Sequence, residues 1–418
     1  MILAANTLYI LYYSVVTAPL KKENFAMQEE LFIKISNNVY TDELLSIKHE
    51  KLNTDTVIKL VKALKINLYI KKLNLLGTHI GDEGLKFLSE VKTLTEFNLS
   101  FCDITSKGVE HLLGSNIKKL NLWGNAIGDE GAEALSRVEQ LKELNLNDCL
   151  IGPMGAKYLS HSTLESLSLT ANNIGDEGAS FLAENKSLIS LYLGECNLTE
   201  IGISVILKNN QIKNLDLYSN SMADYTKITF PENCQLEQLN LSQNLLGDSM
   251  AIEISKLKHL KSLDLNLNWV GDKGAEALAT MISLRELDLS QNNDVKFSSV
   301  KSFFKSKNLE SLSLNLNGLT FSKEDELPEN SSLVKIDLSF NRIDDECESV
   351  LGNLASIPTL KELDLSHNYI GSKGTAILNR YKSPSLTQIN LEKNRVIRKR
   401  SAENTLEKAL TKSLNLGS

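Results

Sequence analysis

Residues 120–135 read Leu-Asn-Leu-Trp-Gly-Asn-Ala-Ile-Gly-Asp-Glu-Gly-Ala-Glu-Ala-Leu, and this stretch decides the fold. Its first half has leucines at alternate positions, which predicts a short β-strand whose leucines point to one face. Its second half predicts a turn and a helix, because Gly128 lets the chain turn, Asp129 offers an N-cap oxygen or a favourable charge at the helix start, and Ala and Leu follow at helical spacing. The stretch is therefore one strand–turn–helix unit.

The same phrase recurs along most of the chain. Its Asn position, called the slot below, is filled in order by Thr78, Cys102, Asn125, Cys149, Asn172, Cys196, Asn220, Asn244, Asn268, Asn292, Asn317, Asn341, Asn368 and Asn394. Successive slots are 23 to 27 residues apart. A degenerate copy precedes them, from Leu45 to Leu52. Self-similarity at this period is the signature of a solenoid.

Stacking follows from the size of one unit, because a unit this short cannot bury its leucines alone. The strands are short and parallel and the helices are bulkier, so we expect an α/β solenoid: a horseshoe with a concave parallel sheet and helices on the convex face. The slot Asn is expected to be buried, where its amide can satisfy unpaired backbone groups. Cys102, Cys149 and Cys196 fill the slot as small buried residues rather than as redox groups.

Composition agrees with this reading. The chain of 418 residues has 73 Leu and 40 Asn, which points to one unit copied many times rather than to several ordinary domains. The formal net charge of −7 argues against a nucleic-acid or anionic-membrane surface as the main working face. Five cysteines without a CxxC pair make neither a disulfide framework nor a structural zinc site, which favours a reducing, cytoplasmic location.

The predicted organisation has four parts. Residues 1–26 are expected to be a disordered extension or an artefact of the assigned start, with Met27 as the biological start; a signal-anchor is the alternative. Residues 27–52 are expected to form an N-terminal cap with the degenerate first repeat, and residues 53–396 to hold about 14 repeats. Residues 397–418 are expected to form a capping helix or tail, with a nuclear or secretion signal as the alternative.

The quoted phrase resembles the leucine-rich repeat family, over roughly Leu45 to Val396. From Thr78 to Asn220, Cys and Asn units alternate as in ribonuclease inhibitor and its relatives, although the units here are shorter. The short unit also resembles repeats of bacterial leucine-rich-repeat effectors delivered into eukaryotic cells, and the 38 Lys against 7 Arg are compatible with a bacterial source. The resemblance implies a horseshoe that binds proteins.

Catalytic signatures are missing from the sequence. No GxGxxG, GxxxxGK[ST], HExxH or GxSxG string occurs, and the six histidines lack metal-ligand spacing. Acidic pairs such as Asp82-Glu83 recur at helix starts and belong to the repeat. We therefore predict no enzyme activity, no metal site and no cofactor.

The concave face remains as the predicted working surface. Strand positions flanking the leucines should point outward, and they include an aromatic group and an acidic column. Aromatic anchors among polar residues are typical of protein-binding hot spots, and an acidic column attracts basic partners. The predicted partner-binding residues are Phe101, Trp123, Tyr192, Tyr218, Asp216, Asp264 and Asp288, with Asp337 and Asp364 continuing the acidic column.

These features predict a non-enzymatic protein-binding module, with a bacterial effector that acts on a host protein as one form of it. The alternative is a regulator of a GTPase, such as an activating protein, that works through the strand-exit loops. A sensor segment like those of innate-immune receptors is less favoured, because no nucleotide-binding domain is present. The expected partner is a protein, without nucleic acid, small-molecule cofactor or membrane contact.

Overall fold

The computed structural model describes residues 24–220, 222, 228–292 and 295–394. They fall into two compact bodies, divided between Asn268 and Trp269, which we call the N-terminal body and the C-terminal body. The expectations for residues 1–23 and 395–418 lie outside the described residues. No helix of the described part is long and apolar enough to span a bilayer.

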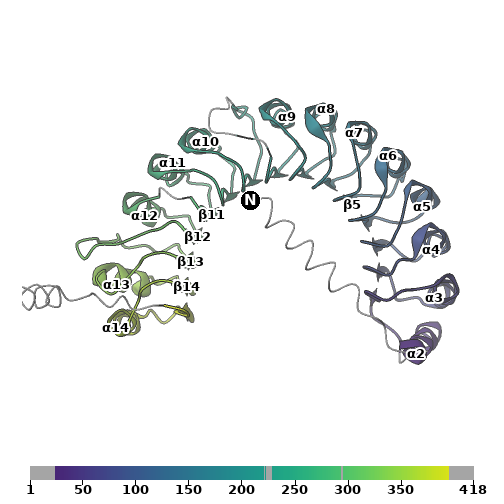
Figure 1. Ribbon diagram of the computed structural model, residues 1–418, viewed down its shortest axis with the longest axis horizontal. Helices are drawn as coiled ribbons and strands as arrows, with labels where there is room; N and C mark the ends of the chain where they lie inside the picture. The colour runs from purple at the N-terminus through teal and green to yellow at the C-terminus, as the bar shows by residue number, and fades with distance from the viewer. Residues whose placement is uncertain (1–23, 221, 223–227, 293–294, 395–418) are drawn as a thin grey trace, which may run out of the picture. The chain divides into compact units, whose positions relative to one another are not determined.

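The N-terminal body holds three-residue parallel strands that pair in chain order (Figure 1). Adjacent strands pair residue by residue, so that Leu120 of one strand lies beside Leu144 of the next. The central side chain of each strand is buried and its two neighbours are partly exposed, as alternation at strand positions requires. The strands are β1 Leu44–Ser46, β2 Lys72–Asn74, β3 Glu96–Asn98, β4 Lys119–Asn121, β5 Glu143–Asn145, β6 Ser166–Ser168, β7 Ser190–Tyr192, β8 Asn214–Asp216, β9 Gln238–Asn240 and β10 Ser262–Asp264.

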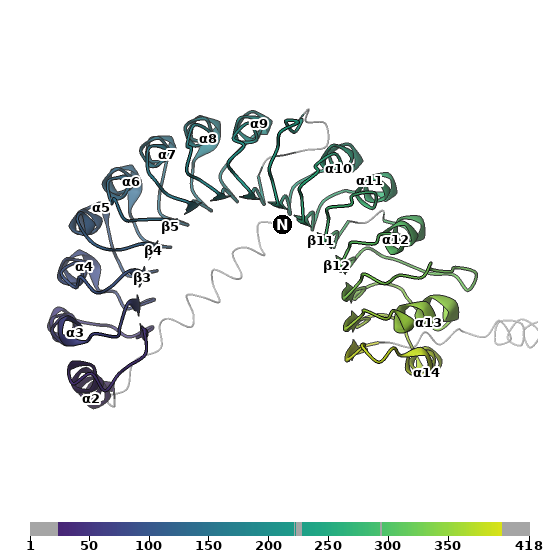
Figure 2. The same ribbon diagram turned by 180° about the vertical axis from the view of Figure 1, so that it is seen from behind.

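Helices cover the side of this body opposite the exposed strand face, so the strands line the inner side of a curved stack (Figure 1, and from behind in Figure 2). They are α2 Asn24–Ser36, α3 Thr54–Ile66, α4 Gly81–Leu88, α5 Ser106–Val109, α6 Gly128–Ser136, α7 Pro153–Ser160, α8 Gly175–Leu182, α9 Glu200–Ile206 and α10 Asp248–Ile254, with a 3-10 turn at Glu110–Leu112. Helix α2 packs against α3 at the first repeat and buries Phe32 and Ile35. The predicted order of strand, turn and helix is confirmed.

The C-terminal body repeats the same architecture. Its strands, parallel and in chain order, are β11 Glu286–Asp288, β12 Ser311–Ser313, β13 Lys335–Asp337, β14 Glu362–Asp364 and β15 Gln388–Asn390. Its helices are α11 Asp272–Leu278, α12 Phe297–Phe304, α13 Glu348–Ser356 and α14 Ser372–Tyr381. Between β12 and β13, where every residue is described, turns and extended chain replace the helix.

A ladder of buried slot residues joins neighbouring repeats, as predicted. Asn125 is 4% exposed; its Nδ2 donates to the carbonyls of Leu99 (2.9 Å) and Leu122 (2.7 Å). Its Oδ1 accepts the N–H groups of Cys102 (3.1 Å) and Ile104 (2.9 Å). One side chain thus satisfies four backbone groups that belong to two successive repeats, and Asn172 repeats the pattern.

A cysteine in the slot makes only some of the hydrogen bonds that an Asn makes there. The thiols of Cys102 and Cys149 point to the carbonyls of Leu75 (3.0 Å) and Leu122 (3.1 Å), as an Asn amide would. A thiol is a poor acceptor, so the turn of the preceding repeat closes differently. Gly128, with φ of +62°, donates its N–H to the backbone carbonyl of Cys149 at 2.9 Å. The alternation of Cys and Asn units therefore follows from two ways of satisfying the same turn.

The aspartate of the Gly-Asp-Glu-Gly turn lies in the first turn of its helix, as one of its two predicted roles requires, but it does not cap that helix. The N-cap positions of α4, α6 and α8 are isoleucines without a side-chain cap, so the expectation that this Asp caps its own helix is wrong. Asp82 and Asp129 instead accept N–H groups of the next repeat, from Thr105 (2.8 Å) and Gly152 (2.6 Å). The next repeat begins its helix there, so the carboxylate links one repeat to the following one.

Candidate partner-binding surface

The last residues of most strands, which are Asn or Asp, were predicted to point outward as a polar column. In the structure their side chains stabilise the turn that follows the strand. The side-chain Oδ1 accepts the backbone N–H two residues on: Asn121 from Trp123 (3.0 Å), Asp216 from Tyr218 (3.0 Å). The same bond is made by Asn74, Asn98, Asn145, Asn240, Asp264, Asp288, Asp337, Asp364 and Asn390. Asn and Asp interchange there because the turn requires one oxygen.

The residues two positions after these strand ends, such as Ser100 after Asn98, were also predicted to point outward. For the serines at these positions the prediction is wrong. Ser100 is 1% exposed, since its hydroxyl turns back to donate to Asn98 Oδ1 at 2.7 Å. Ser242 makes the equivalent bond to Asn240 at 2.7 Å. A side chain this short closes onto its own turn, so only large residues at these positions reach a partner.

Trp123 and Phe101 form a contacting aromatic pair. Their ring centroids are 5.0 Å apart and the ring planes meet at 61°, an edge-to-face arrangement. The Phe101 N–H donates to the Trp123 carbonyl at 2.9 Å, which fixes the two backbones. A Cβ at Gly124 would overlap the Phe101 ring, so this glycine makes room for the pair. Trp123 remains 38% exposed and is available to a partner.

Tyr192, Asp216 and Tyr218 form a second group, on the neighbouring strands β7 and β8. Tyr192 lies beside Asp216 in the strand register and is 36% exposed. Tyr218 covers Gly194, where a Cβ would overlap its ring, and its hydroxyl donates to Glu195 Oε1 at 2.8 Å. Burial and that hydrogen bond raise the pKa of Tyr218, so the phenol stays neutral. Tyr192 is the more accessible anchor of the group.

The predicted acidic column is less uniform than the sequence indicated. Asp216 and Asp264 belong to the N-terminal body, with Asn240 on the strand between them, and Asp288 belongs to the C-terminal body. Asp216 Oδ2 accepts from the Asn240 amide at 3.0 Å, and burial raises the pKa of Asp216. Asp337 and Asp364 are direct neighbours in the C-terminal body. One carboxylate oxygen of each aspartate accepts a backbone N–H of its own turn, which leaves the other oxygen for further contacts.

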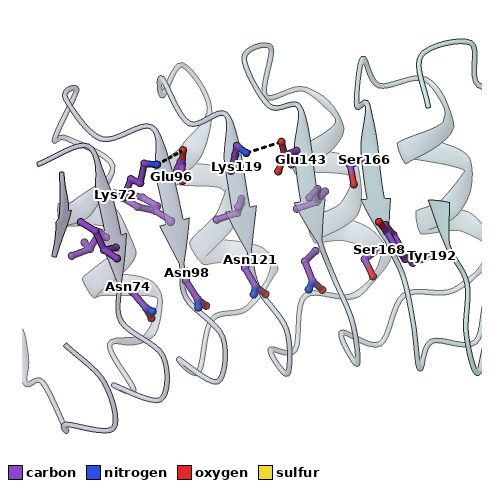
Figure 3. Close-up of a pocket in the computed structure, with 16 residues that line it drawn as sticks. Lys72, Asn74, Glu96, Asn98, Lys119, Asn121, Glu143, Ser166, Ser168 and Tyr192 are labelled. Atoms are coloured by element: carbon purple, nitrogen blue, oxygen red, sulfur yellow. Dashed lines mark ion pairs between the residues drawn. The ribbon is translucent and has the colours of Figure 1, made fainter. Parts of the chain in front are cut away.

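A groove of about 560 Å³ runs over the exposed face of the first strands of the N-terminal body (Figure 3). Lysine and glutamate alternate at the strand starts and pair across strands: Lys72 with Glu96 (3.4 Å) and Lys119 with Glu143 (2.8 Å). Tyr192 lies at the far end of the groove. Tyr192 was predicted from the sequence and the ion pairs were not, although Lys and Glu alternate before the strand leucines.

In the described part of the chain, no group of three or more His, Cys, Asp or Glu side chains is placed to hold a metal ion. The five cysteines are buried, and burial raises the pKa of Cys149, Cys196 and Cys347 to about 12. Such thiols are neutral and covered, so they are poor nucleophiles at neutral pH.

Comparison with known families agrees with the repeat geometry. Residues 67–89, 92–113, 115–136, 160–183, 256–279, 329–346 and 356–375 match the family described as Leucine Rich repeat. The chain carries leucine-rich repeats. Proteins built on this repeat are typically binding modules rather than enzymes, and nothing in the comparisons indicates catalysis. No curated protein sequence matches the chain.

A solved leucine-rich repeat protein has a similar fold. A leucine-rich repeat protein of Leptospira interrogans has a TM-score of 0.50 at 21% identity, over 86% of this chain and 98% of that one. The mouse RP105/MD-1 complex gives 0.52 at 19% identity, over 87% and 69%. An internalin of Listeria monocytogenes gives 0.46 at 20% identity, over 86% and 88%. At these identities the likeness concerns the fold alone.

Proposed function

We propose that this leucine-rich repeat protein is a non-enzymatic module that binds a protein partner on the inner strand face of its N-terminal body. The observation that carries the proposal is the pairing of a groove with exposed aromatic anchors. Tyr192 lines the groove, and Trp123 follows two residues after Asn121, which also lines it. Large, rigid aromatic side chains lose little conformational entropy on binding, which is why they dominate protein-binding hot spots.

The charges of the groove favour a partner with a mixed polar surface. Lys72, Glu96, Lys119 and Glu143 neutralise one another in pairs, so the groove presents alternating signs instead of one strong field. These pairs are roughly half exposed, and exposed pairs contribute little affinity by themselves. They would instead select the register of a partner whose charges alternate in the opposite order. The aromatic side chains would supply most of the affinity.

The proposal extends to a bacterial effector that acts on a host protein in a reducing, cytoplasmic setting. Its support is the short repeat, the excess of Lys over Arg, and five buried thiols without a disulfide. The ribonuclease-inhibitor-like alternation of Cys and Asn units belongs to the same proposal. Proximity labelling in host cells tests it: enrichment of one host protein by the wild type and not by a Trp123→Ala/Tyr192→Ala variant supports it.

A GTPase regulator is the second candidate. It would use exposed polar side chains on the loops that follow the strands, and Arg342 and Lys393 are exposed at such positions in the C-terminal body. A panel of purified GTPases separates the two functions. Faster GTP hydrolysis that is lost in Arg342→Ala would favour the regulator, whereas unchanged rates favour the binding module.

The binding experiment uses matched aromatic controls. A pull-down compares the wild type with Trp123→Ala and Tyr192→Ala, and with Trp269→Ala and Tyr381→Ala, which remove aromatics that are 70% and 49% exposed in the C-terminal body. We expect the first two variants to lose a partner at least tenfold and the controls to keep it, with circular dichroism unchanged throughout. Equal retention of all partners by all four variants would overturn the proposed surface.

A further inference from the structure

A second groove lies in the C-terminal body, where strands β12, β13, β14 and β15 end. It encloses about 690 Å³, and we call it the exit groove. Leu316, Phe340, His367 and Lys393 form one wall, one residue from each of four successive repeats. Arg342 and Tyr369 also line the groove, each two residues after a member of that first wall, with buried Asn341 and Asn368 between them in sequence.

The backbone holds the first wall in place. Leu316, Phe340, His367 and Lys393 all have left-handed φ angles, between 54° and 56°. The Phe340 N–H donates to the Ser366 carbonyl at 3.0 Å and the His367 N–H to the Glu392 carbonyl at 3.0 Å. Each side chain therefore projects from the same point of its repeat, at the spacing of adjacent strands, about 4.8 Å. Little ordering is left for a ligand to impose, which favours affinity.

The first wall exposes apolar surface. Leu316 is 43% exposed and Phe340 42% exposed. The Phe340 ring stacks on the His367 ring, with centroids 3.7 Å apart and planes 13° apart. One face of the phenyl ring is thus taken up inside the protein, and the apolar surface left to a partner is that of Leu316 and Phe340 together.

The two permanently charged residues that line the exit groove have the same sign. Of its lining residues, Arg342 and Lys393 carry positive charge and none is acidic. Neither forms an ion pair with a carboxylate elsewhere in the described chain. Asp344, two residues from Arg342, accepts the Glu346 N–H at 2.9 Å and so caps its own turn. Both cations are exposed, so they are accessible to carboxylates of a partner.

We propose that the exit groove binds an acidic segment of a protein partner that carries an aliphatic side chain between its carboxylates. The aliphatic side chain would lie on Leu316 and Phe340, and the carboxylates would pair with Arg342 and Lys393. The site lies in the C-terminal body and does not depend on the surface proposed for the N-terminal body. A strand of nucleic acid fits less well, because its bases stack on aromatic rings and would leave the exposed aliphatic side chain of Leu316 without a matching contact.

Fluorescence polarisation with the full-length chain tests the proposal. The probes are a labelled peptide of alternating Glu and Leu, its Lys–Leu counterpart, and labelled oligouridine. We expect saturable binding of the Glu–Leu peptide, weakening as salt is raised. Phe340→Ala and the double variant Arg342→Ala/Lys393→Ala should each weaken it at least tenfold, while Arg342→Lys/Lys393→Arg should keep most of it.

The matched control is Arg380→Ala/Lys382→Ala, which removes the same charge from exposed positions outside the groove. Equal loss in this control would mean unspecific attraction and would overturn the site. Equal binding of the Lys–Leu peptide would do the same. Tight binding of oligouridine that is lost in Phe340→Ala would replace the proposal with a nucleic-acid surface. Thermal unfolding of each variant verifies that the fold is kept.

Discussion

The carboxylate of Asp82 occupies the space that a side chain on Gly108 would need. A Cβ built on Gly108 would overlap Asp82 Oδ1, although the two residues belong to different repeats. The same carboxylate accepts the N–H of Thr105 at 2.8 Å and its hydroxyl at 2.6 Å. Gly202 stands in the same relation to Asp176. The aspartate of one repeat and the helix glycine of the next therefore form one structural device.

A double-mutant cycle on this pair gives the first prediction. Gly→Ala in a helix ordinarily stabilises by about 1 kcal/mol, but Gly108→Ala should destabilise, because its methyl group displaces Asp82. In the Asp82→Ala background the same substitution should cost about 1 kcal/mol less, since the carboxylate is gone, although Ile104 stays close. Urea unfolding of the four proteins measures the coupling. Independent, additive effects would contradict the device.

The sequence predicted those features that each repeat encodes within itself. Strand, slot and helix were found because alternating leucines, a fixed Asn and helical Ala/Leu spacing are local signals that fourteen slot residues repeat. The link between Asp82 and Gly108 was missed because it joins two repeats and depends on how the repeats stack. Ser100 was placed outward by its phase, yet its hydroxyl folds back on Asn98.

The candidate surfaces were predicted less completely for a related reason. Trp123 and Tyr192 stand at strand positions whose direction follows from alternation, so their exposure could be read from phase. Trp269, the most exposed aromatic among the large hydrophobics at 70%, follows the slot, where the repeat fixes no residue type. The exit groove uses variable positions on both sides of the slot, and only the stacked backbone brings Phe340 and His367 together.

The second prediction concerns the buried ladder. Asn125→Ala removes both the acceptor for Cys102 and Ile104 and the donor to two carbonyls, so four buried backbone groups lose their partner. We expect a loss of about 2–5 kcal/mol in unfolding free energy, since each unsatisfied group costs roughly 1–3 kcal/mol before relaxation. Asn125→Cys should recover only part of it, because a thiol donates but accepts poorly. Asn233→Ala, at an exposed turn of the same body, is the control. Wild-type stability for Asn125→Cys would show that the two slot types are interchangeable.

The third prediction separates architecture from electrostatics at Asp288. Its Oδ1 accepts the Ser290 N–H at 2.8 Å, a bond that asparagine makes at the equivalent position of other repeats. Asp288→Asn should therefore leave stability within about 0.5 kcal/mol, whereas Asp288→Ala should lose about 1 kcal/mol. If the acidic column steers a basic partner, Asp288→Asn should still slow association at low salt. Stopped-flow kinetics with the captured partner measure this, and an unchanged rate would limit Asp288 to its turn.

The last prediction follows from the buried thiols. Burial raises the pKa of Cys149 and Cys196 from 9.0 to about 12, so the folded protein keeps these thiols neutral at pH values where the unfolded chain ionises them. Ionisation then stabilises the unfolded state as the pH rises, so the free energy of unfolding should fall between pH 9 and 12. Below pH 9 these thiols contribute no pH dependence, because they are neutral in both states. Urea unfolding at pH 8 and pH 10.5 measures the effect. The change in unfolding free energy between the two pH values should be smaller in a Cys149→Ala/Cys196→Ala variant than in the wild type.

An aromatic disulfide reagent at pH 8 should label the cysteines only after unfolding, because all five are covered. Rapid labelling of Cys102, Cys149 or Cys196 in the native protein would show that the slots open, and would contradict the rigid ladder from which the alkaline loss is derived.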